Sequence, residues 1–158
     1  MKELIIKEKI MSFLDSYDVY DKNGDVIYRI KGSISLGHCF KVYNKHDEEV
    51  AVLKEELLKL LPSFKIIVND ECIGHIKKEL TFLRPKFNIE FKGWKVKGNI
   101  WEWDYSIYDE RNTIAEISKK IISFTDTYTI KVFNDEDELN VLLIVAAIDA
   151  IKCSQSGN

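Results

Sequence analysis

The apolar segment from Leu139 to Ile151 constrains the fold more than any other part of the sequence. Asn140 and Asp149 are its only polar residues, so a helix formed here has no polar face to turn toward water. The segment is also shorter than the roughly 18–20 apolar residues that a membrane-spanning helix requires. We therefore expect a helix that is surrounded by protein, within a shell supplied by the rest of the chain.

An acidic run marks the expected start of this helix. Asp135 is predicted to be the N-cap, and Glu138, three residues later, completes a pair of the capping-box type. Acidic side chains are favoured at this end because the helix dipole makes the N-terminus positive. We expect Asn140 and Asp149 to lie near the mouths of the shell or to bond to strand backbone, since an unpaired polar group is costly to bury.

The part of the chain before the helix repeats one short pattern six times, an aromatic residue followed two positions later by a β-branched residue. Successive pairs are 23, 24, 23, 18 and 23 residues apart. Residues two apart lie on the same face of a strand, so each pair indicates one strand with one buried face. The pairs are Tyr17/Val19, Phe40/Val42, Phe64/Ile66, Phe87/Ile89, Tyr105/Ile107 and Tyr128/Ile130.

Each of the first five pairs is followed by Asn, Asp or Gly residues, which suit tight hairpin turns because they tolerate positive φ. A second strand then ends in an aliphatic residue and usually a lysine. The repeating unit is therefore a β-hairpin of about 23 residues, and successive units form an antiparallel meander. The turns are expected at residues 22–25, 44–47, 69–70, 92–93 and 109–112.

The sixth unit lacks its second strand, because the chain becomes helical after residues 134–138. Residues 4–7 have the second-strand pattern with no first strand before them, so pairing them with the sixth strand closes the sheet and removes its exposed edges. Twelve strands at ~4.8 Å spacing and ~40° tilt leave a bore about as wide as a helix. The prediction is a mainly β fold, a closed twelve-stranded antiparallel β-barrel that encloses the C-terminal hydrophobic α-helix, as one domain over residues 1–158.

Composition narrows the class of protein. A formal net charge of −3 argues against nucleic acid as a partner. Cys39, Cys72 and Cys153 are widely spaced and form no CxxC motif, which argues against a disulfide framework or a zinc site and favours a reducing compartment. The charges in residues 1–7 do not suit a signal peptide, and no segment is long enough for a transmembrane helix. We expect a cytoplasmic protein.

Six short segments, spread over almost the whole chain, carry a resemblance to a known family. They are Ile6-Lys7-Glu8-Lys9, Tyr17-Asp18-Val19-Tyr20-Asp21, Arg84-Pro85-Lys86-Phe87, the stretch from Ala115 to Lys120, Asp126-Thr127-Tyr128, and the stretch from Leu142 to Ala150. Together they resemble the LURP-one-related family, which is similar in fold to the Tubby C-terminal domain and to phospholipid scramblases. The resemblance implies a twelve-stranded barrel around a hydrophobic helix. Tubby-type relatives bind phosphoinositide head groups, but the resemblance assigns no lipid-binding residue to this chain.

No motif in the sequence predicts an enzyme. Ser33 has neighbouring glycines but lacks the GxSxG spacing of a nucleophile elbow. His38 and Cys39 are adjacent, so on a strand they point to opposite faces and do not meet as base and nucleophile. His46 and His75 belong to no metal-binding pattern. We therefore expect no catalytic residue, no metal and no cofactor.

The stretch from Lys77 to Lys97 is strongly basic, with only Glu79 and Glu90 as acidic residues. If its basic side chains share one face, that face attracts anionic lipid head groups, at about 1 kcal/mol per basic residue. Outward-facing lysines are also a routine means of keeping a barrel soluble. The candidate anion- or lipid-binding residues are Lys77, Lys78, Arg84, Lys86, Lys92, Lys95 and Lys97.

Three tryptophans bear on the same question. Trp101 and Trp103 are expected on one strand face, with Trp94 nearby. Exposed tryptophans would favour lipid binding, because Trp is enriched at membrane interfaces, whereas burial in the barrel wall is the alternative.

Two hypotheses for function follow. With the bore filled by a helix, recognition is expected on the outer surface or at the ends of the barrel, which favours a binding module over an enzyme. The first hypothesis is a non-enzymatic module, peripheral at the membrane, that binds anionic phospholipid or another phosphorylated partner through the Lys77–Lys97 region. The second is a protein-interaction or structural scaffold domain with no small-molecule ligand.

Overall fold

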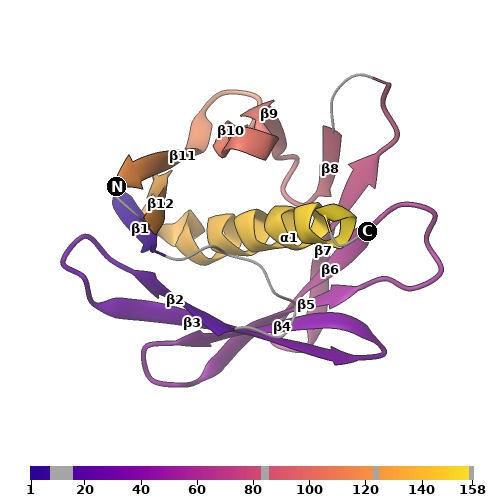
Figure 1. The fold of residues 1–158 in the computed structure, drawn as a ribbon, viewed down its shortest axis with the longest axis horizontal. Helices are drawn as coiled ribbons and strands as arrows, with labels where there is room; N and C mark the ends of the chain where they lie inside the picture. The colour runs from indigo at the N-terminus through magenta and orange to yellow at the C-terminus, as the bar shows by residue number, and fades with distance from the viewer. Residues whose placement is uncertain (8–15, 83–85, 123–124, 157–158) are drawn as a thin grey trace.

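The computed structural model describes residues 1–158 except 8–15, 83–85, 123–124 and 157–158. The described residues form twelve strands, two short 3₁₀ turns and one long helix (Figure 1). The first six strands are β1 (Lys2–Ile6), β2 (Ser16–Tyr20), β3 (Val26–Ser35), β4 (Gly37–Asn44), β5 (Glu49–Glu55) and β6 (Ser63–Val68). The other six are β7 (Glu71–Glu79), β8 (Lys86–Glu90), β9 (Lys95–Asn99), β10 (Asp104–Tyr108), β11 (Thr113–Ile122) and β12 (Thr125–Val132). The remaining elements are η1 (Ile100–Glu102), η2 (Asp135–Asp137) and α1 (Glu138–Ser156).

The strands form one antiparallel sheet that wraps around α1 (Figure 1). As predicted, the first strand completes the sixth hairpin unit: β1 pairs with β12, and Leu4 lies opposite Ile130. This pairing joins the two ends of the chain's β region, which lie far apart in the sequence. The prediction of a twelve-stranded barrel around the C-terminal helix is confirmed.

The barrel is nearly closed, with a seam between β8 and β9. These strands are the two outermost in the sheet order, and no register joins them within the described residues, although the repeat predicted a hairpin there. The turn itself forms as expected, since Lys92 and Gly93 have the positive φ values of a tight turn. Trp94 accounts for the splayed strands: it is 4% exposed and packs edge-on against Phe91, with ring centroids 5.4 Å apart.

The repeated aromatic and β-branched pairs fall on the even-numbered strands, β2 to β12. Their β-branched members are all buried against the helix, and Phe64 is buried completely. Tyr17 and Phe87 are only partly buried and pack at the edge of the core. One shared core therefore joins the inner face of the sheet to α1, whose residues from Val141 to Ile148 are all buried.

The helix begins differently from the prediction. Asn134, not Asp135, is the capping residue, and its side chain accepts a hydrogen bond from the Glu136 backbone N–H at 3.3 Å. The reason is that a 3₁₀ turn, η2, precedes α1 and moves the cap one residue upstream. Glu138 instead accepts a hydrogen bond from the Tyr28 hydroxyl and forms an ion pair with Lys2 Nζ, both at 2.8 Å, which fix the helix start to β3 and β1.

The placement of the tryptophans on one strand face was wrong. Trp101 lies in η1, and Trp103 follows it with a left-handed φ of 58°, so both occupy a tight connection rather than a strand. Asn99 accounts for the turn, because its side chain accepts a hydrogen bond from the Glu102 backbone N–H. Trp94 and Trp103 are buried, whereas Trp101 is 44% exposed.

Candidate functional site

Three hairpin ends project from the side of the barrel where α1 finishes (Figure 1, right). They connect β3 to β4, β5 to β6 and β7 to β8. The β3–β4 and β5–β6 connections approach each other closely at Gly37, where a Cβ atom would lie 2.9 Å from the Leu57 side chain. The β5–β6 and β7–β8 connections are tied together by the Lys78 backbone N–H, which donates to the Pro62 carbonyl oxygen at 3.0 Å. These two contacts join the bases of neighbouring connections at this end of the barrel.

Large apolar side chains are exposed at this end of the barrel, and we call them the apolar rim. Leu58, Leu60 and Phe82 are fully exposed, and Leu36 and Leu80 are each about three-quarters exposed or more. Contiguous exposed apolar groups on a folded domain mark interaction sites, because leaving them in water is unfavourable. The apolar rim consists of Ile34, Leu36, Leu57, Leu58, Leu60, Leu80 and Phe82.

Charges at the apolar rim are arranged unevenly. Lys59 is exposed between two of the rim leucines. The two carboxylates nearby are both engaged by histidines: Glu55 lies 2.6 Å from His38 Nδ1, and Glu56 lies 3.2 Å from His75 Nδ1. Lys59 is therefore an exposed charge set directly among the rim leucines, whereas Glu55 and Glu56 are each engaged by a histidine.

The predicted basic residues do not converge into one patch. Three of them, Lys86, Lys95 and Lys97, line a groove of about 470 Å³ along the seam between β8 and β9, which we call the seam groove. Its walls also include Trp94 and Tyr108. Of the seven candidates, these three are the ones that the structure brings together. Arg84 lies outside the described residues.

The other candidates are dispersed. Lys77 is on the outer wall of β7 and forms an ion pair with Glu90 at 3.0 Å. Lys78 is partly buried on the next position of the same strand. Lys92 lies at the opposite end of the barrel, where it binds Asp137 at 3.0 Å beside the start of α1. A lysine held in an ion pair contributes more to the stability of the fold than to a positive surface potential.

The last turns of α1 bring two charged residues into the barrel. Asp149 is 2% exposed, and burial raises the pKa of its carboxyl well above the usual range, an effect that nearby Lys152 opposes. Burial likewise raises the pKa of Tyr17 and Tyr105 well above the ordinary value, and the Asp149 carboxylate adds to that rise. Lys152 directs its Nζ at the Ile100 carbonyl oxygen, 2.9 Å away. These groups are enclosed by the barrel wall and offer little to a ligand in solution.

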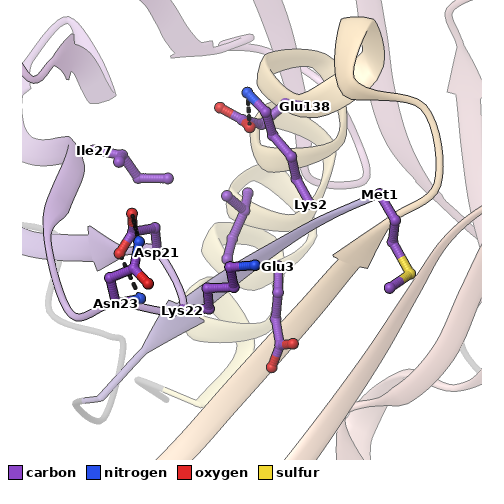
Figure 2. A pocket seen from close by; sticks show the side chains of 9 residues that line it. Met1, Lys2, Glu3, Asp21, Lys22, Asn23, Ile27 and Glu138 are labelled. Atoms are coloured by element: carbon purple, nitrogen blue, oxygen red, sulfur yellow. Dashed lines mark hydrogen bonds and ion pairs between the residues drawn. The ribbon is translucent and has the colours of Figure 1, made fainter.

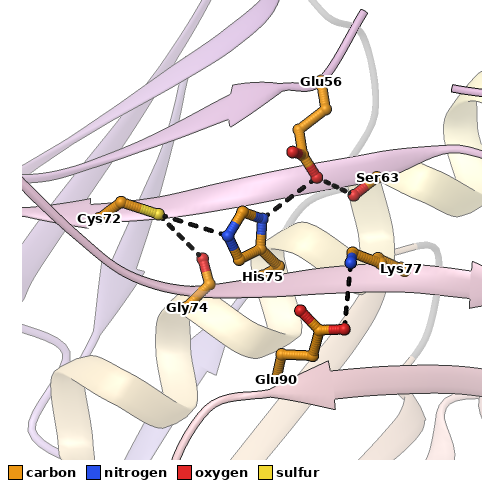
Figure 3. A network of polar contacts seen from close by, with 7 residues as sticks. All are labelled: Glu56, Ser63, Cys72, Gly74, His75, Lys77 and Glu90. Atoms are coloured by element: carbon orange, nitrogen blue, oxygen red, sulfur yellow. Dashed lines mark hydrogen bonds and ion pairs between the residues drawn. The ribbon is translucent and has the colours of Figure 1, made fainter. Parts of the chain in front are cut away.

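A polar network lies on the outer wall of β5, β6 and β7 (Figure 3). Cys72 Sγ is 3.7 Å from His75 Nε2, and His75 Nδ1 is 3.2 Å from Glu56, which also accepts a hydrogen bond from the Ser63 hydroxyl. Partial burial disfavours the ionised carboxyl, but hydrogen bonds from Ser63 and His75 outweigh it and hold the pKa of Glu56 below its ordinary value. The network places a thiol beside an oriented imidazole.

A cavity of about 300 Å³ opens at the other end of the barrel, beside the start of α1 (Figure 2). Its polar groups bind one another: Lys2 is paired with Glu138, and Asp21 accepts a hydrogen bond from Asn23. The cavity therefore presents few unsatisfied groups to a ligand. In the described part of the chain, no cluster of three or more His, Cys, Asp or Glu side chains is arranged to hold a metal ion. Within the same residues, no helix has the length and apolar character needed to cross a membrane.

The fold defines a class, a nearly closed β-barrel filled by its own C-terminal helix. The family model of the LURP-one-related proteins matches residues 2–149, and the chain belongs to that family. It is 28% identical over 152 residues to the uncharacterized protein YxjI of Bacillus subtilis strain 168, covering 96% of this chain and 94% of the relative. An X-ray structure of a protein from Arabidopsis thaliana superposes with a TM-score of 0.68 over 95% of this chain and 91% of the other. At 13% identity, that likeness shows the fold alone.

Sequence reasoning missed both the apolar rim and the thiol network. The leucines of the apolar rim carry a faint signal: residues 57–61 hold four leucines around Lys59 in a segment that has no strand alternation. The thiol network had no signal in the sequence, because Cys72 and His75 are three residues apart and belong to no recognised motif.

Proposed function

We propose that this protein is a non-enzymatic binding module that docks from the cytoplasm onto membranes containing anionic phospholipid, with the apolar rim as its insertion surface. The observation that carries the proposal is the set of seven exposed, large apolar side chains on three adjoining hairpin ends. Scattered single apolar residues are normal on a protein surface, but an array gathered at one end of the barrel is not.

The form of the apolar rim favours lipid over a protein partner. Its most exposed side chains are carried on two connections, Leu58 and Leu60 after β5 and Phe82 after β7, rather than on one flat strand or helix face. Separate apolar tips insert individually among acyl chains, and a lysine such as Lys59 then reaches the head groups while its aliphatic stem stays among apolar atoms. A protein partner needs a matching surface that covers all the tips at once.

The filled bore supports the same proposal. Since α1 occupies the centre of the barrel, the described structure leaves recognition to the outer wall and the ends. Enzyme sites are usually concave pockets that exclude water around a few converging polar groups, whereas the seam groove and the cavity near α1 are both open to solvent. A binding role therefore fits the shape of the molecule better than catalysis does.

The expected strength of binding is moderate. Burial of one large apolar side chain contributes about 1.5–3 kcal/mol. Each lysine close to an anionic surface adds about 1 kcal/mol. Three rim side chains and two lysines therefore supply about 6.5–11 kcal/mol before the entropic cost of association, which suits reversible, peripheral attachment.

Flotation with liposomes tests the proposal. The full chain is mixed with vesicles of phosphatidylcholine alone or of phosphatidylcholine with phosphatidylglycerol, and the floated fraction is measured at low and high salt. We expect flotation with the anionic vesicles and a large loss in the double variant Leu58→Ser/Phe82→Ser. The matched control is Phe133→Ser, since Phe133 is exposed but lies beside η2, where α1 begins.

Two results would contradict the proposal. One is wild-type protein that stays at the bottom with anionic vesicles at low salt. The other is a folded rim variant that floats as well as wild type. A protein-interaction scaffold would then be the better account, and it predicts that the rim variant loses a co-purifying protein while vesicles have no effect on wild type.

A further inference from the structure

A β-bulge places Cys72 and His75 on the same outer face of the barrel. In a regular strand, residues three apart point to opposite faces. In β7, however, Gly74 lies opposite Ile66 while Cys72 lies opposite Ile67, so Ile73 is an extra residue without a partner. The extra residue shifts the alternation by one position, and Cys72 joins His75 on the outward side. Bulges of this kind often redirect a side chain next to a functional group.

The His75 imidazole lies between Glu56 and Cys72 and is held in a defined orientation (Figure 3). Glu56 is fixed by the Ser63 hydroxyl, and its carboxylate accepts from His75 Nδ1 at 3.2 Å. With the proton on Nδ1, the lone pair of Nε2 faces Cys72 Sγ at 3.7 Å. The thiol has a second contact at 3.6 Å, to the Gly74 carbonyl oxygen. A nucleophile, a base and a group that orients the base are thus aligned along one wall.

Charged groups on β6, on β8 and on the connection after β5 surround His75. Lys65 on β6 and Glu90 on β8 lie directly opposite His75 in the sheet, and Glu56 approaches from the connection after β5. Glu90 also binds Lys77 at 3.0 Å. The imidazole therefore has carboxylates on two sides and the Lys65 ammonium on a third.

The three cysteines differ in access. Cys72 is exposed, whereas Cys39 and Cys153 are each partly buried. Burial raises the pKa of the Cys153 thiol, and the Asp149 carboxylate adds to that rise. Cys72 is therefore the cysteine with both access to solvent and an oriented base, and the other two serve as comparisons within one molecule.

We propose that Cys72 is a modification site, a nucleophilic thiol activated by His75 that reacts with hydroperoxides. His75 Nε2 takes the thiol proton, and the Cys72 thiolate attacks one oxygen of hydrogen peroxide. An S–O bond forms, the O–O bond breaks, and the departing hydroxide takes the proton back from His75 as water. Cys72 is oxidised to the sulfenic acid and the peroxide is reduced to water.

The second step needs a thiol from solution. Cys39 on β4 is three strand spacings from β7, roughly 14 Å, far beyond the reach of a disulfide. A low-molecular-weight thiol therefore condenses with the sulfenic acid, releases water and leaves a mixed disulfide on Cys72. This inference does not depend on membrane binding, and the two proposals are tested by separate experiments.

Site-resolved labelling of the full chain tests the proposal. The protein is treated with iodoacetamide over a pH series, or with hydrogen peroxide and dimedone, and each cysteine is followed by peptide mass spectrometry. We expect Cys72 to react about tenfold faster than Cys39 or Cys153 and about tenfold slower in His75→Ala. Glu56→Gln should shift the pH profile of Cys72, because the amide no longer holds Nδ1–H with a negative charge. His46→Ala is the matched control, since His46 lies in the β4–β5 turn.

The experiment has to distinguish a thiol that is only accessible to solvent from one that is activated by His75. The rate constant of each cysteine is therefore also measured in urea, where all three are exposed and no base is positioned. An activated Cys72 reacts faster in the native protein than in urea, whereas a merely exposed one does not. Equal native and unfolded rates, or an unchanged rate in folded His75→Ala, would overturn the proposal.

Discussion

Lys152 Nζ donates a hydrogen bond to the Ile100 carbonyl oxygen at 2.9 Å, which joins the last turns of α1 to the connection between β9 and β10. The same ammonium lies 4.3 Å from the centre of the Trp103 ring. Contacts between α1 and the strands are otherwise mainly apolar, and apolar packing does not by itself fix the rotation of a helix inside a barrel. The polar contact from Lys152 selects one rotation at this end, as Glu138 does at the other.

Replacing Lys152 with methionine should therefore destabilise the fold. The variant keeps most of the side-chain volume but removes the charged hydrogen bond to the Ile100 carbonyl, which keeps only the Trp103 backbone N–H at 3.3 Å, and it removes the cation from the Trp103 ring. Losing a hydrogen bond to a charged group costs about 1.5–3 kcal/mol. Urea unfolding followed by tryptophan fluorescence measures the change, with Lys45→Met in an exposed turn as the control. A free energy of unfolding equal to that of wild type would show that apolar packing alone holds the helix.

Asp149 makes stability depend on pH. Its Oδ2 is buried and has no hydrogen-bond partner in the described residues, and burial raises its pKa while Lys152 opposes the rise. The groups facing it are Lys152 and Cys153 on α1, with Tyr17 and Tyr105 on the sheet. A carboxyl whose pKa is higher in the folded state stabilises that state below the unfolded value of about 3.9, and this contribution is lost as pH rises through the folded pKa.

Asp149→Asn should therefore be more stable than wild type at pH 8 and nearly equal to it below about pH 4. A gain of 1 kcal/mol corresponds to about 2–4 °C in Tm for a chain of this size. Thermal unfolding across a pH series measures the difference, and Glu71→Gln, at an exposed carboxylate, is the control. A difference between Asp149→Asn and wild type that stays constant over the whole series would contradict the role given to burial.

The centre of the helix should be the least tolerant of truncation. Leu143 is completely buried, and Leu143→Ala removes contacts and leaves a cavity, at a cost of about 2–5 kcal/mol. Leu58→Ala makes the same chemical change at a fully exposed position and should cost less than about 0.5 kcal/mol. Equilibrium unfolding in urea compares the two. A small loss for Leu143→Ala would mean that the bore is more loosely filled than the structure indicates.

The architecture was predictable because its signals are local. Each hairpin is encoded by a pattern within about 23 residues of sequence. The turn at Asn69 and Asp70, for example, has the positive φ values that these residue types predict. The pairing of β1 with β12 followed from two incomplete units that complement each other. The pairing of the first strand with the last could thus be predicted without knowing any long-range contact.

The interaction surfaces were not predictable in the same way. The sequence does not show whether a leucine such as Leu60 is buried or exposed. In the structure Leu60 is fully exposed, which depends on how the chain packs around it. The meeting of Cys72 with His75 depends on one extra residue in the register of β7 with β6. The splayed seam depends on where Trp94 packs. All three features arise from tertiary packing, which a periodic sequence pattern does not encode.

The seam groove offers a test of the basic residues that the structure brings together. If Lys86 and Lys97 add to binding at anionic membranes, Lys86→Glu/Lys97→Glu should lower vesicle flotation at low salt and have less effect at high salt, because exposed charges are screened. Lys22→Glu/Lys45→Glu is the charge-matched control, since Lys22 lies in the β2–β3 turn and Lys45 in the β4–β5 turn. Equal losses in the two variants would mean that net charge, not the groove, determines the effect.

Gly98 shows how closely β9 approaches β10 beside the seam. Its φ is +130°, and a Cβ atom there would lie 2.5 Å from the Asp104 carbonyl oxygen and 2.6 Å from Tyr105 Cα. Both neighbours are backbone atoms, so relief requires the strands to separate, and Gly98→Ala should cost more than about 2 kcal/mol. Gly24 also has a positive φ, +88°, but a Cβ there meets nothing within 4 Å. Gly24→Ala should therefore cost only the backbone strain of about 1 kcal/mol. Equal losses of unfolding free energy in the two variants would show that strain alone matters and that β9 can move away from β10 at little cost.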